Sequence, residues 1–473
     1  MSPRLGETCQ RLEIEDAWIV DPGSAREGRG SLLVEGGRIG EVRWARGRAT
    51  RATPDLLVLP GMVDIHAHLR QPGNEDAETI ASGLAAAAHG GFTTVCAMAN
   101  TDPPLDHAAN LREVQGLAGE APTPVRLLAY ATISEGRAGT VLARLGELSD
   151  AGAVGFSDDG APVDDGTLLR SALAYAGALD RPVMEHPELR TLTQGAEANE
   201  GLPATILGLQ GWPRSAEWTA VARALGLLDE AVRAAPSGDR PRLHLAHVST
   251  AEALDLIRIA RQAGLPVTCE VTPHHLALHD GWVGGDRRWA WDAAADPWAG
   301  AAAEAAPYDP ATRVNPPLRA PTDALALWSG LADGTIQAIA TDHAPHRAVD
   351  KQVEYGQAAT GISGLETALA VALEGVAAGL TDLATVVRAL TLGPAAIIDP
   401  PERATASHEL VPGLVTGAVA DLVVVDRRAA WTVNADSLVS RGKNTPLLGR
   451  SLPARVLLTV AQGRFAYLDP DLA

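Results

Sequence analysis

Two histidines spaced two residues apart, His66 and His68, come directly after an apolar run at residues 56–63. Side chains two apart on a β-strand point to the same face, so both imidazoles would aim at one point where the strand ends. Two nitrogen ligands that converge in this way suit a first-row transition metal. A single pair of histidines can equally cap a hydrophobic core, so the pattern needs support from elsewhere in the chain.

Four later apolar runs also stop at residues that can bind metals. The runs at 153–156, 182–185, 243–246 and 336–341 are followed by Asp159, His186, His247 and Asp342. Taken singly, Asp159 reads as a turn residue, His186 as a core histidine and Asp342 as a helix cap. Unrelated causes at five strand ends explain the whole set poorly. The set therefore predicts a metal-dependent hydrolase.

The predicted centre has two metal positions. Its six ligands divide so that His66, His68 and Asp342 hold one metal, His186 and His247 hold the other, and Asp159 bridges. Imidazole and carboxylate ligands without thiolate suit Zn²⁺, one or two ions per subunit, with Mn²⁺ or Co²⁺ as substitutes. Such a site activates water for attack on a carbonyl carbon, and Asp342 would pass the proton to the leaving nitrogen.

Three more histidines lie near these strand ends. We expect His244 on the opposite face of its strand from His247, which leaves His247 as the ligand. The sequence Thr-Pro at 272–273 indicates that the strand has turned before His274 and His275. These two are therefore expected beside the metals and not bound to them.

Lysine is almost absent from the chain. Lys351 and Lys443 are its only lysines, and neither ends an apolar run. Many binuclear hydrolases bridge their metals with a carboxylated lysine. Here the bridging ligand is predicted to be an ordinary carboxylate.

The spacing of the candidate ligands implies the elements that hold them. Eight apolar runs between residues 58 and 405 are each followed by a helical stretch, the pattern of βα units and a parallel sheet. Eight such units close into a (β/α)₈ barrel of the TIM type, whose catalytic groups gather at the C-terminal strand ends. An insertion at 282–308, rich in tryptophan, is either a surface excursion or a cover for the site.

The two chain ends have a different texture. Short strands separated by turns occupy the first 57 residues and residues 406–473. We therefore expect an α/β protein in three segments: 1–57 as the first part of a small β-sandwich, 58–405 as the barrel, and 406–473 as the second part of the sandwich.

Composition excludes several classes of protein. The net charge is −19, from 39 basic and 58 acidic residues, which argues against nucleic acids and anionic membranes because both need a basic face. The cysteines, Cys9, Cys96 and Cys269, are too few and too widely spaced for a disulfide framework or a thiolate zinc site. No apolar leader or membrane-spanning run is evident, so a cytoplasmic location is predicted.

Five motifs, in order, resemble those of class I bacterial dihydroorotases, which belong to the amidohydrolase superfamily. They are DIHAHLR at 64–70, MANT at 98–101, FSDDG at 156–160, VNPPLR at 314–319 and ATDHAPH at 340–346. The resemblance extends from about residue 12 to the C-terminus. It implies the reversible cyclisation of N-carbamoyl-L-aspartate to L-dihydroorotate in pyrimidine (UMP) biosynthesis.

The resemblance also implies roles for individual residues. The six residues above would be the metal ligands, with Asp342 also the general acid and base. Five others would bind the substrate: Arg70, Asn100, Asn315, His346 and Gly361. A guanidinium suits the carboxylate of dihydroorotate. The expected partners are a small-molecule substrate and further copies of the chain in a homo-oligomer, with aspartate transcarbamoylase as a candidate.

Two other readings stay open from the sequence. Allantoinase and hydantoinase (dihydropyrimidinase) open related cyclic amides on the same fold, but they usually use the carboxylated lysine and need no arginine for a substrate carboxylate. A non-catalytic, dihydroorotase-like partner of aspartate transcarbamoylase would have lost its ligands, whereas all six positions are filled here. Thr360, where phenylalanine is common in the family, leaves the preference among cyclic amides open.

Overall fold

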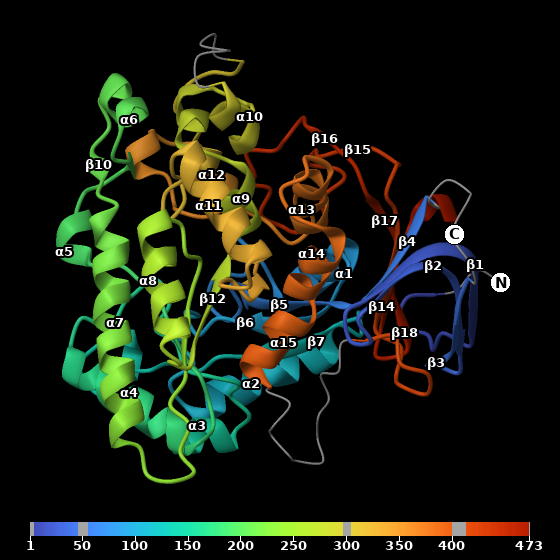
Figure 1. The fold of residues 1–473 in the computed structure, drawn as a ribbon, viewed down its shortest axis with the longest axis horizontal. Coiled ribbons are helices and arrows are strands. Elements are labelled where there is room, and N and C mark those ends of the chain that lie inside the picture. Colours follow the sequence, from blue (N-terminus) through green and yellow to red (C-terminus); the bar gives the residue numbers. More distant parts are fainter. Residues whose placement is uncertain (1–3, 46–54, 297–303, 400–412, 473) are drawn as a thin grey trace.

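The computed structural model describes residues 4–45, 55–296, 304–399 and 413–472. The chain is an α/β protein in which parallel strands are surrounded by helices, and a sheet built from both chain ends lies beside them (Figure 1). Among the described residues, no helix is both long enough and apolar enough to cross a membrane.

The parallel strands form two groups. They are β5 (Met62–Ala67), β6 (Phe92–Ala97) and β7 (Arg126–Ala129) in one sheet, and β8 (Val183–Glu185), β11 (Leu243–Leu245), β12 (Val267–Val271) and β13 (Ala338–Ile339) in the other. Single parallel bridges join the groups at both sides: Ala131 and Val183 each pair with Phe156, and Ala67 pairs with His343. These strands coincide with seven of the eight predicted runs. The remaining run, at residues 153–156, contributes only the pairings of Phe156.

Helices follow the strands and cover their outer side. Their bounds are α1 (Ile80–Gly90), α2 (Ala108–Glu120), α3 (Leu145–Asp150), α4 (Gly166–Ala178), α5 (Arg190–Thr193), α6 (Leu202–Leu207), α7 (Ser215–Ala234), α8 (Ala251–Gln262), α9 (Pro273–Ala277), α10 (Ala290–Ala295), α11 (Pro321–Ala332), α12 (Ala348–Lys351), α13 (Ala368–Ala377), α14 (Leu383–Leu390) and α15 (Leu392–Ile398). Local sequence sets several of these limits. Thr79 and Ser82 form a capping box at the start of α1, and Gly91, with a φ of 92°, ends it.

Two layers of apolar side chains hold this part together. Outward residues of the strands, such as Val95 and Leu245, pack against the helices in the largest cluster of buried residues. Residues on the other face, such as Ile65, Met98 and Ala246, form a second cluster with α15. With both faces buried, the strands read as continuous apolar runs, and this is why the sequence located them.

Strands from both ends of the chain pair into one seven-stranded sheet. Its order is β18 (Arg464–Leu468), β17 (Arg455–Ala461), β14 (Leu422–Asp426), β4 (Leu56–Pro60), β1 (Arg11–Asp21), β2 (Arg26–Glu35) and β3 (Arg38–Trp44). The sheet has its own buried cluster, and bridges between Arg38 and Val419 and between Thr8 and Arg464 tie its outer strands to distant neighbours. Where we expected a small sandwich, the two ends therefore share a single sheet, because β4 hydrogen-bonds to both β1 and β14.

The two predicted limits between segments can be compared with the structure only in part. The limit between residues 57 and 58 falls inside β4, because the apolar run at 56–63 is divided at Gly61 between the terminal sheet and β5. The limit between 405 and 406 lies outside the described residues. Short pairs of strands that we did not predict also occur, β9 (Ala198–Asn199) with β10 (Gly211–Trp212) and β15 (Trp431–Thr432) with β16 (Ser451–Leu452).

The tryptophan-rich insertion is packed against the body of the molecule. Its described part contains α10, and the rings of Trp289 and Trp291 stack 5.4 Å apart while Trp291 meets Trp328 of α11 edge-on. The guanidinium of Arg450 lies 3.5 Å from the centre of the Trp289 ring. None of its described residues lines the cavity at the predicted metal centre. The surface alternative therefore fits this part better than the cover.

Candidate active site

The structure brings all six predicted metal ligands together. His66, His68, Asp159, His186, His247 and Asp342 are buried, each with at most 5% of its surface exposed. Two groups have donor atoms close enough to hold an ion: His66 with His68 and Asp342, and His66 with Asp159 and His247. Five of these residues lie at or just after the ends of β5, β8, β11 and β13, and Asp159 follows the isolated bridges of Phe156, so that all six meet at one edge of the parallel strands.

Asp159 lies between the two halves of this cluster. Its Oδ2 is 3.5 Å from Nε2 of both His66 and His68, whereas its Oδ1 is 3.3 Å from His186 Nδ1 and 3.6 Å from His247 Nε2. Asp342 Oδ1 lies 3.0 Å from His68 Nε2. One carboxylate that turns an oxygen toward each pair of histidines has the arrangement of a bridging ligand.

Neighbouring side chains fix which nitrogen three of the four histidines present. His66 Nδ1 lies 2.6 Å from Glu270 Oε1. Because a carboxylate only accepts, Nδ1 carries a proton, and Nε2 is the nitrogen that faces the cluster. Within the described part of the chain, this buried Nε2 has no hydrogen-bond partner. A buried ring nitrogen without a partner, among other donor atoms, is typical of a metal ligand.

Two further histidines, His68 and His186, are held in the same manner. His68 Nδ1 lies 2.9 Å from Asn100 Oδ1, and His186 Nε2 lies 3.0 Å from Glu188 Oε2. Glu188 also accepts from the amide of Asn315, at 3.0 Å. Each of these two rings thus has one nitrogen directed to a supporting oxygen and the other directed into the cluster, whereas the buried Nδ1 of His247 has no hydrogen-bond partner among the described residues.

Electrostatics of the site favour added positive charge. Burial alone would lower the pKa of His66, but the carboxylates of Asp159 and Glu270 raise it well above its usual value. Burial alone would raise the pKa of Asp342, but a hydrogen bond from His68 and the charge of His66 hold it well below its usual range. The residues present therefore fit a divalent cation.

The backbone is strained at three of the predicted site residues. Arg70, His247 and Asp342 have φ values of 60°, 33° and 44°, in the left-handed region that side chains other than glycine rarely adopt. Asp64 helps to impose this arrangement, since its carboxylate accepts from the backbone N–H of both His66 and Thr341, at 3.2 and 3.0 Å. The end of β5 and the segment after β13 are held together in this way.

The same backbone geometry corrects one prediction. His244 and His247 do not lie on opposite faces: His244 Nε2 is 3.1 Å from Glu270 Oε2, and the ring of His247 is 5.3 Å from that of His66. Strand alternation ends with β11 at Leu245, and the positive φ of His247 turns its side chain back to the cluster. Alternation was extended here beyond the regular strand.

A cavity of about 240 Å³ opens above the cluster. Besides five of the ligands it is lined by all five predicted substrate-binding residues, Arg70, Asn100, Asn315, His346 and Gly361. Arg70 Nε donates to the carbonyl of Pro345 at 3.1 Å, and its Nη2 lies 3.4 Å from Nε2 of His346. A Cβ on Gly361 would lie 2.6 Å from Ala344 Cβ, so this position has no room for a side chain.

These features are accompanied by a clear relationship to known proteins. A profile of the family described as Dihydro-orotase-like matches residues 55–253. A dihydroorotase of Anaeromyxobacter sp. (strain K) is 43% identical over 460 residues, which cover 96% of this chain and 98% of that protein. A dihydroorotase of Syntrophus aciditrophicus is 41% identical over 464 residues, 97% and 100% of the two chains. The chain belongs to the dihydroorotase family.

Solved structures of other enzymes share the fold of this dihydroorotase-family chain. An L-hydantoinase (dihydropyrimidinase) from Arthrobacter aurescens superimposes with a TM-score of 0.77 at 24% identity, covering 98% of this chain and 97% of that one. A D-hydantoinase (dihydropyrimidinase) from Thermus sp. has a TM-score of 0.72 at 21% identity, with 98% and 96% covered. At such identities the likeness concerns the fold alone.

Both lysines are engaged away from the cluster. Lys351 Nζ donates to three backbone carbonyls, and Lys443 Nζ donates to the carbonyl of Leu438. Neither lines the cavity. The side chain that lies between the two pairs of histidines is the carboxylate of Asp159.

Sequence reasoning missed three residues that support the site. Glu270 and Glu188 orient ligand histidines, and Asn444 binds two segments of the cavity wall. Asn444 accepts from the His346 N–H at 2.8 Å and donates to the Gly361 carbonyl at 3.0 Å. A signal existed for Glu270, because a charged residue inside the apolar run of β12 needs a partner. No local pattern marks Asn444.

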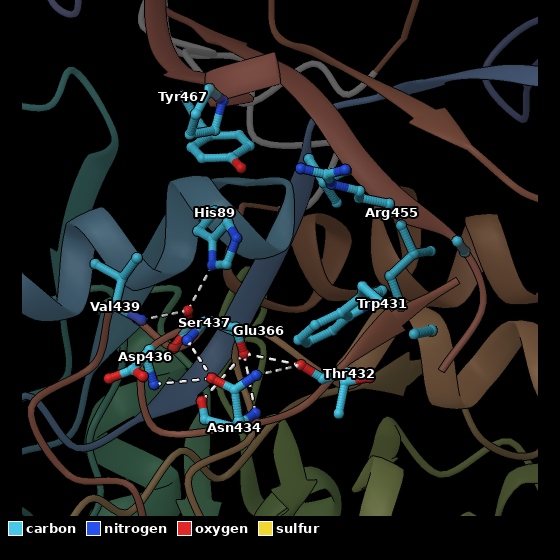
Figure 2. Close-up of a pocket in the computed structure, with 15 residues that line it drawn as sticks. His89, Glu366, Trp431, Thr432, Asn434, Asp436, Ser437, Val439, Arg455 and Tyr467 are labelled. Carbon is cyan, nitrogen blue, oxygen red and sulfur yellow. Dashed lines mark hydrogen bonds and ion pairs between the residues drawn. The ribbon is translucent and has the colours of Figure 1, made fainter. Parts of the chain in front are cut away.

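A second cavity, of about 420 Å³, lies between α1, α13 and the C-terminal strands (Figure 2). His89 Nδ1 donates to Glu366 Oε1 at 2.5 Å, and Glu366 Oε1 also accepts from the Val439 N–H at 2.7 Å. Arg455 pairs with both carboxylate oxygens of Asp469. Trp431 and Tyr467 line its walls in Figure 2. None of the predicted site residues lines this cavity.

Proposed function

We propose that this chain is a dihydroorotase that interconverts N-carbamoyl-L-aspartate and L-dihydroorotate plus water, in the pathway to UMP. The observation that carries the proposal is the position of Arg70, which lines one cavity with Asp342 and the histidine cluster. A guanidinium beside a hydrolytic centre suits a cyclic amide that bears a carboxylate. Its full-length relatives are named dihydroorotase, which supports the same reaction.

We propose zinc as the metal, one or two ions per subunit, because the donors are imidazoles and carboxylates without thiolate. His66, His68 and Asp342 would hold one position, His186 and His247 the other, and Asp159 would bridge. Zinc in such a set supplies Lewis-acid chemistry, which polarises an amide carbonyl and activates water.

Asp342 is the proposed proton carrier. Its carboxylate lies at the cavity wall, and the neighbouring histidines hold its pKa below the usual range, so that it is ionised before water attacks. In ring opening it would take the proton from the attacking water and give it to the departing ring nitrogen. In ring closure it would take the proton from the ureido nitrogen and give it to the departing hydroxide, which leaves as water.

We assign substrate binding to five residues that line the cavity in addition to the proposed metal ligands. Arg70 would pair with the carboxylate of dihydroorotate. Asn100 accepts from His68 through Oδ1, which leaves its amide N–H groups as donors to the same carboxylate. Asn315 donates to Glu188, which leaves its Oδ1 as an acceptor for a ring or ureido N–H. His346 and Gly361 complete this wall.

Several larger-scale expectations join this proposal. We propose that the eight units close into a (β/α)₈ barrel, supported by the bridges of Phe156 and His343 that link the two groups of strands. The three segments 1–57, 58–405 and 406–473, a homo-oligomeric state, a cytoplasmic location and aspartate transcarbamoylase as partner stay predictions. Light scattering of the purified chain, alone and mixed with aspartate transcarbamoylase, tests the oligomeric state and the partner.

The experiment that tests the function is a metal-supplemented assay of the purified protein. L-dihydroorotate, hydantoin, dihydrouracil and allantoin are offered in parallel, and loss of each ring is measured. Turnover of dihydroorotate alone is expected. Turnover of another ring would favour a hydantoinase or an allantoinase, and no turnover with or without aspartate transcarbamoylase would contradict catalysis. Activity should not depend on bicarbonate, because neither lysine lies at the cluster.

A further inference from the structure

Lys351 has an unusual environment for a lysine. It is the last residue of α12 and only 6% exposed. Its Nζ donates to the carbonyls of Pro310 at 2.9 Å, Arg313 at 3.1 Å and Ala359 at 2.7 Å. An ammonium group has three donors, and here all three have partners, as a buried charge requires.

The three segments that meet at Lys351 all reach the cavity. Arg313 lies two residues before Asn315, Ala359 lies two residues before Gly361, and Lys351 lies five residues after His346. Asn315, Gly361 and His346 line the cavity, whereas Lys351 does not. The ammonium group therefore joins three stretches of backbone that each contribute a residue to the wall of this cavity.

Other contacts join the same segments without the lysine. The Gly361 N–H donates to the carbonyl of Arg313 at 2.9 Å, a backbone bond between two of them. His346 Nε2 lies 2.9 Å from the carbonyl of Thr360, and the guanidinium of Arg313 donates to the carbonyl of Ala358. Since these contacts do not involve Lys351, they should keep the fold intact when the lysine is replaced. The loss of its three hydrogen bonds should loosen only the spacing between the segments.

We propose that Lys351 is a positioning residue for substrate binding: its ammonium group sets the spacing of the segments that carry Asn315, His346 and Gly361. It acts through these residues and does not touch the substrate. The inference rests on the proposed function, because it assumes that this wall binds the substrate. Its closest alternative is a purely structural role, in which Lys351 contributes to stability and not to substrate affinity.

The substitution Lys351→Met separates these roles, because methionine keeps an unbranched apolar stem and removes the three donors. We expect KM for dihydroorotate to rise by about tenfold while kcat and metal content stay close to wild type, since small displacements of positioning groups have effects of this order. The matched control is Lys443→Met, which removes the chain's other lysine and should leave KM unchanged. An unchanged KM in Lys351→Met, or equal KM values in the two variants, would overturn the proposal.

A measurement on the wild-type protein covers the case in which Lys351→Met does not fold. Lysine labelled with ¹³C at Cε gives two side-chain NMR signals, because the chain has two lysines, and Lys443→Met assigns them. Addition of the equilibrium mixture of dihydroorotate and N-carbamoyl-L-aspartate should shift the Lys351 signal and leave the Lys443 signal in place. A Lys351 signal that does not respond at saturation would contradict the proposal.

The failure of this inference can be told apart from failure of the proposed function. If wild-type protein turns over dihydroorotate and Asn315→Ala raises KM while Lys351→Met does not, only the role of Lys351 is wrong. If wild-type protein does not turn over dihydroorotate, the proposed function itself fails.

Discussion

Two cavities of this molecule differ in whether their polar groups have partners within the chain. The larger one has a volume of about 420 Å³, and its charged groups His89, Glu366 and Arg455 all have partners within the chain. The smaller one, about 240 Å³, lies above the cluster that contains His66, whose buried Nε2 has no hydrogen-bond partner among the described residues. Volume alone would favour the larger cavity, which is lined by none of the predicted site residues. Unmatched buried donors and acceptors are the better guide to chemistry, since burying them is costly unless a ligand completes them.

The strongest test of this contrast is the pair Asp342→Ala and His89→Ala. Asp342 is the proposed proton carrier, so its removal should lower kcat by about 10²–10⁴-fold while the protein stays folded. His89 belongs to the larger cavity, so its removal should leave kcat/KM unchanged. Steady-state kinetics and circular dichroism of both variants give the answer. Near-normal rates in Asp342→Ala would remove it from the mechanism.

Arg70→Met tests the substrate side of the smaller cavity. The guanidinium is proposed to pair with the substrate carboxylate, so we expect a loss of roughly 2–5 kcal/mol of binding free energy, seen mainly in KM. The control is Arg455→Met in the larger cavity, for which KM should not change. If Arg70→Met has the KM of the wild type, the arginine does not bind substrate.

Glu270→Gln sharpens the role of buried partners at the metal centre. Glutamine keeps the shape of the side chain but weakens the interaction that holds the proton on His66 Nδ1. We expect metal affinity to fall by about 10–100-fold, measured by competition with a chromophoric chelator. Glu147→Gln, on an exposed helix surface, serves as the control. Wild-type metal affinity in Glu270→Gln would show that His66 needs no such support.

Glu366→Gln has the smallest expected effect and concerns the larger cavity. Glu366 accepts from His89 and from the backbone N–H groups of Val439 and Ser440. An amide places a donor against one of these donors, which should lower the free energy of unfolding by about 1–3 kcal/mol, measured in urea. Turnover should stay at the wild-type level. Loss of turnover in a stable Glu366→Gln variant would mean that the larger cavity serves the reaction.

Predictions from sequence succeeded where a local pattern has one structural meaning. The run before His66 and the run before Asp342 are buried on both faces, so they read as strands, and residues at their ends had to share one edge. The expectation for His244 failed because strand alternation says nothing about a residue beyond the strand. The run at residues 153–156 lies between its expected neighbours, but in the structure it forms only the isolated bridges of Phe156 and no regular strand.

The amino-acid sequence by itself determined the order of strands and helices, the candidate ligands and the membership of a family, because hydrophobic periodicity and motif spacing are local properties. Only the tertiary structure decided how those ligands face one another. Asp159 stands between two pairs of histidines, and Glu270, Asn444 and Lys351 support the cavity from positions far away in the chain. Such contacts depend on the packing of distant segments and on backbone angles such as the positive φ of His247, which no local pattern of residues specifies.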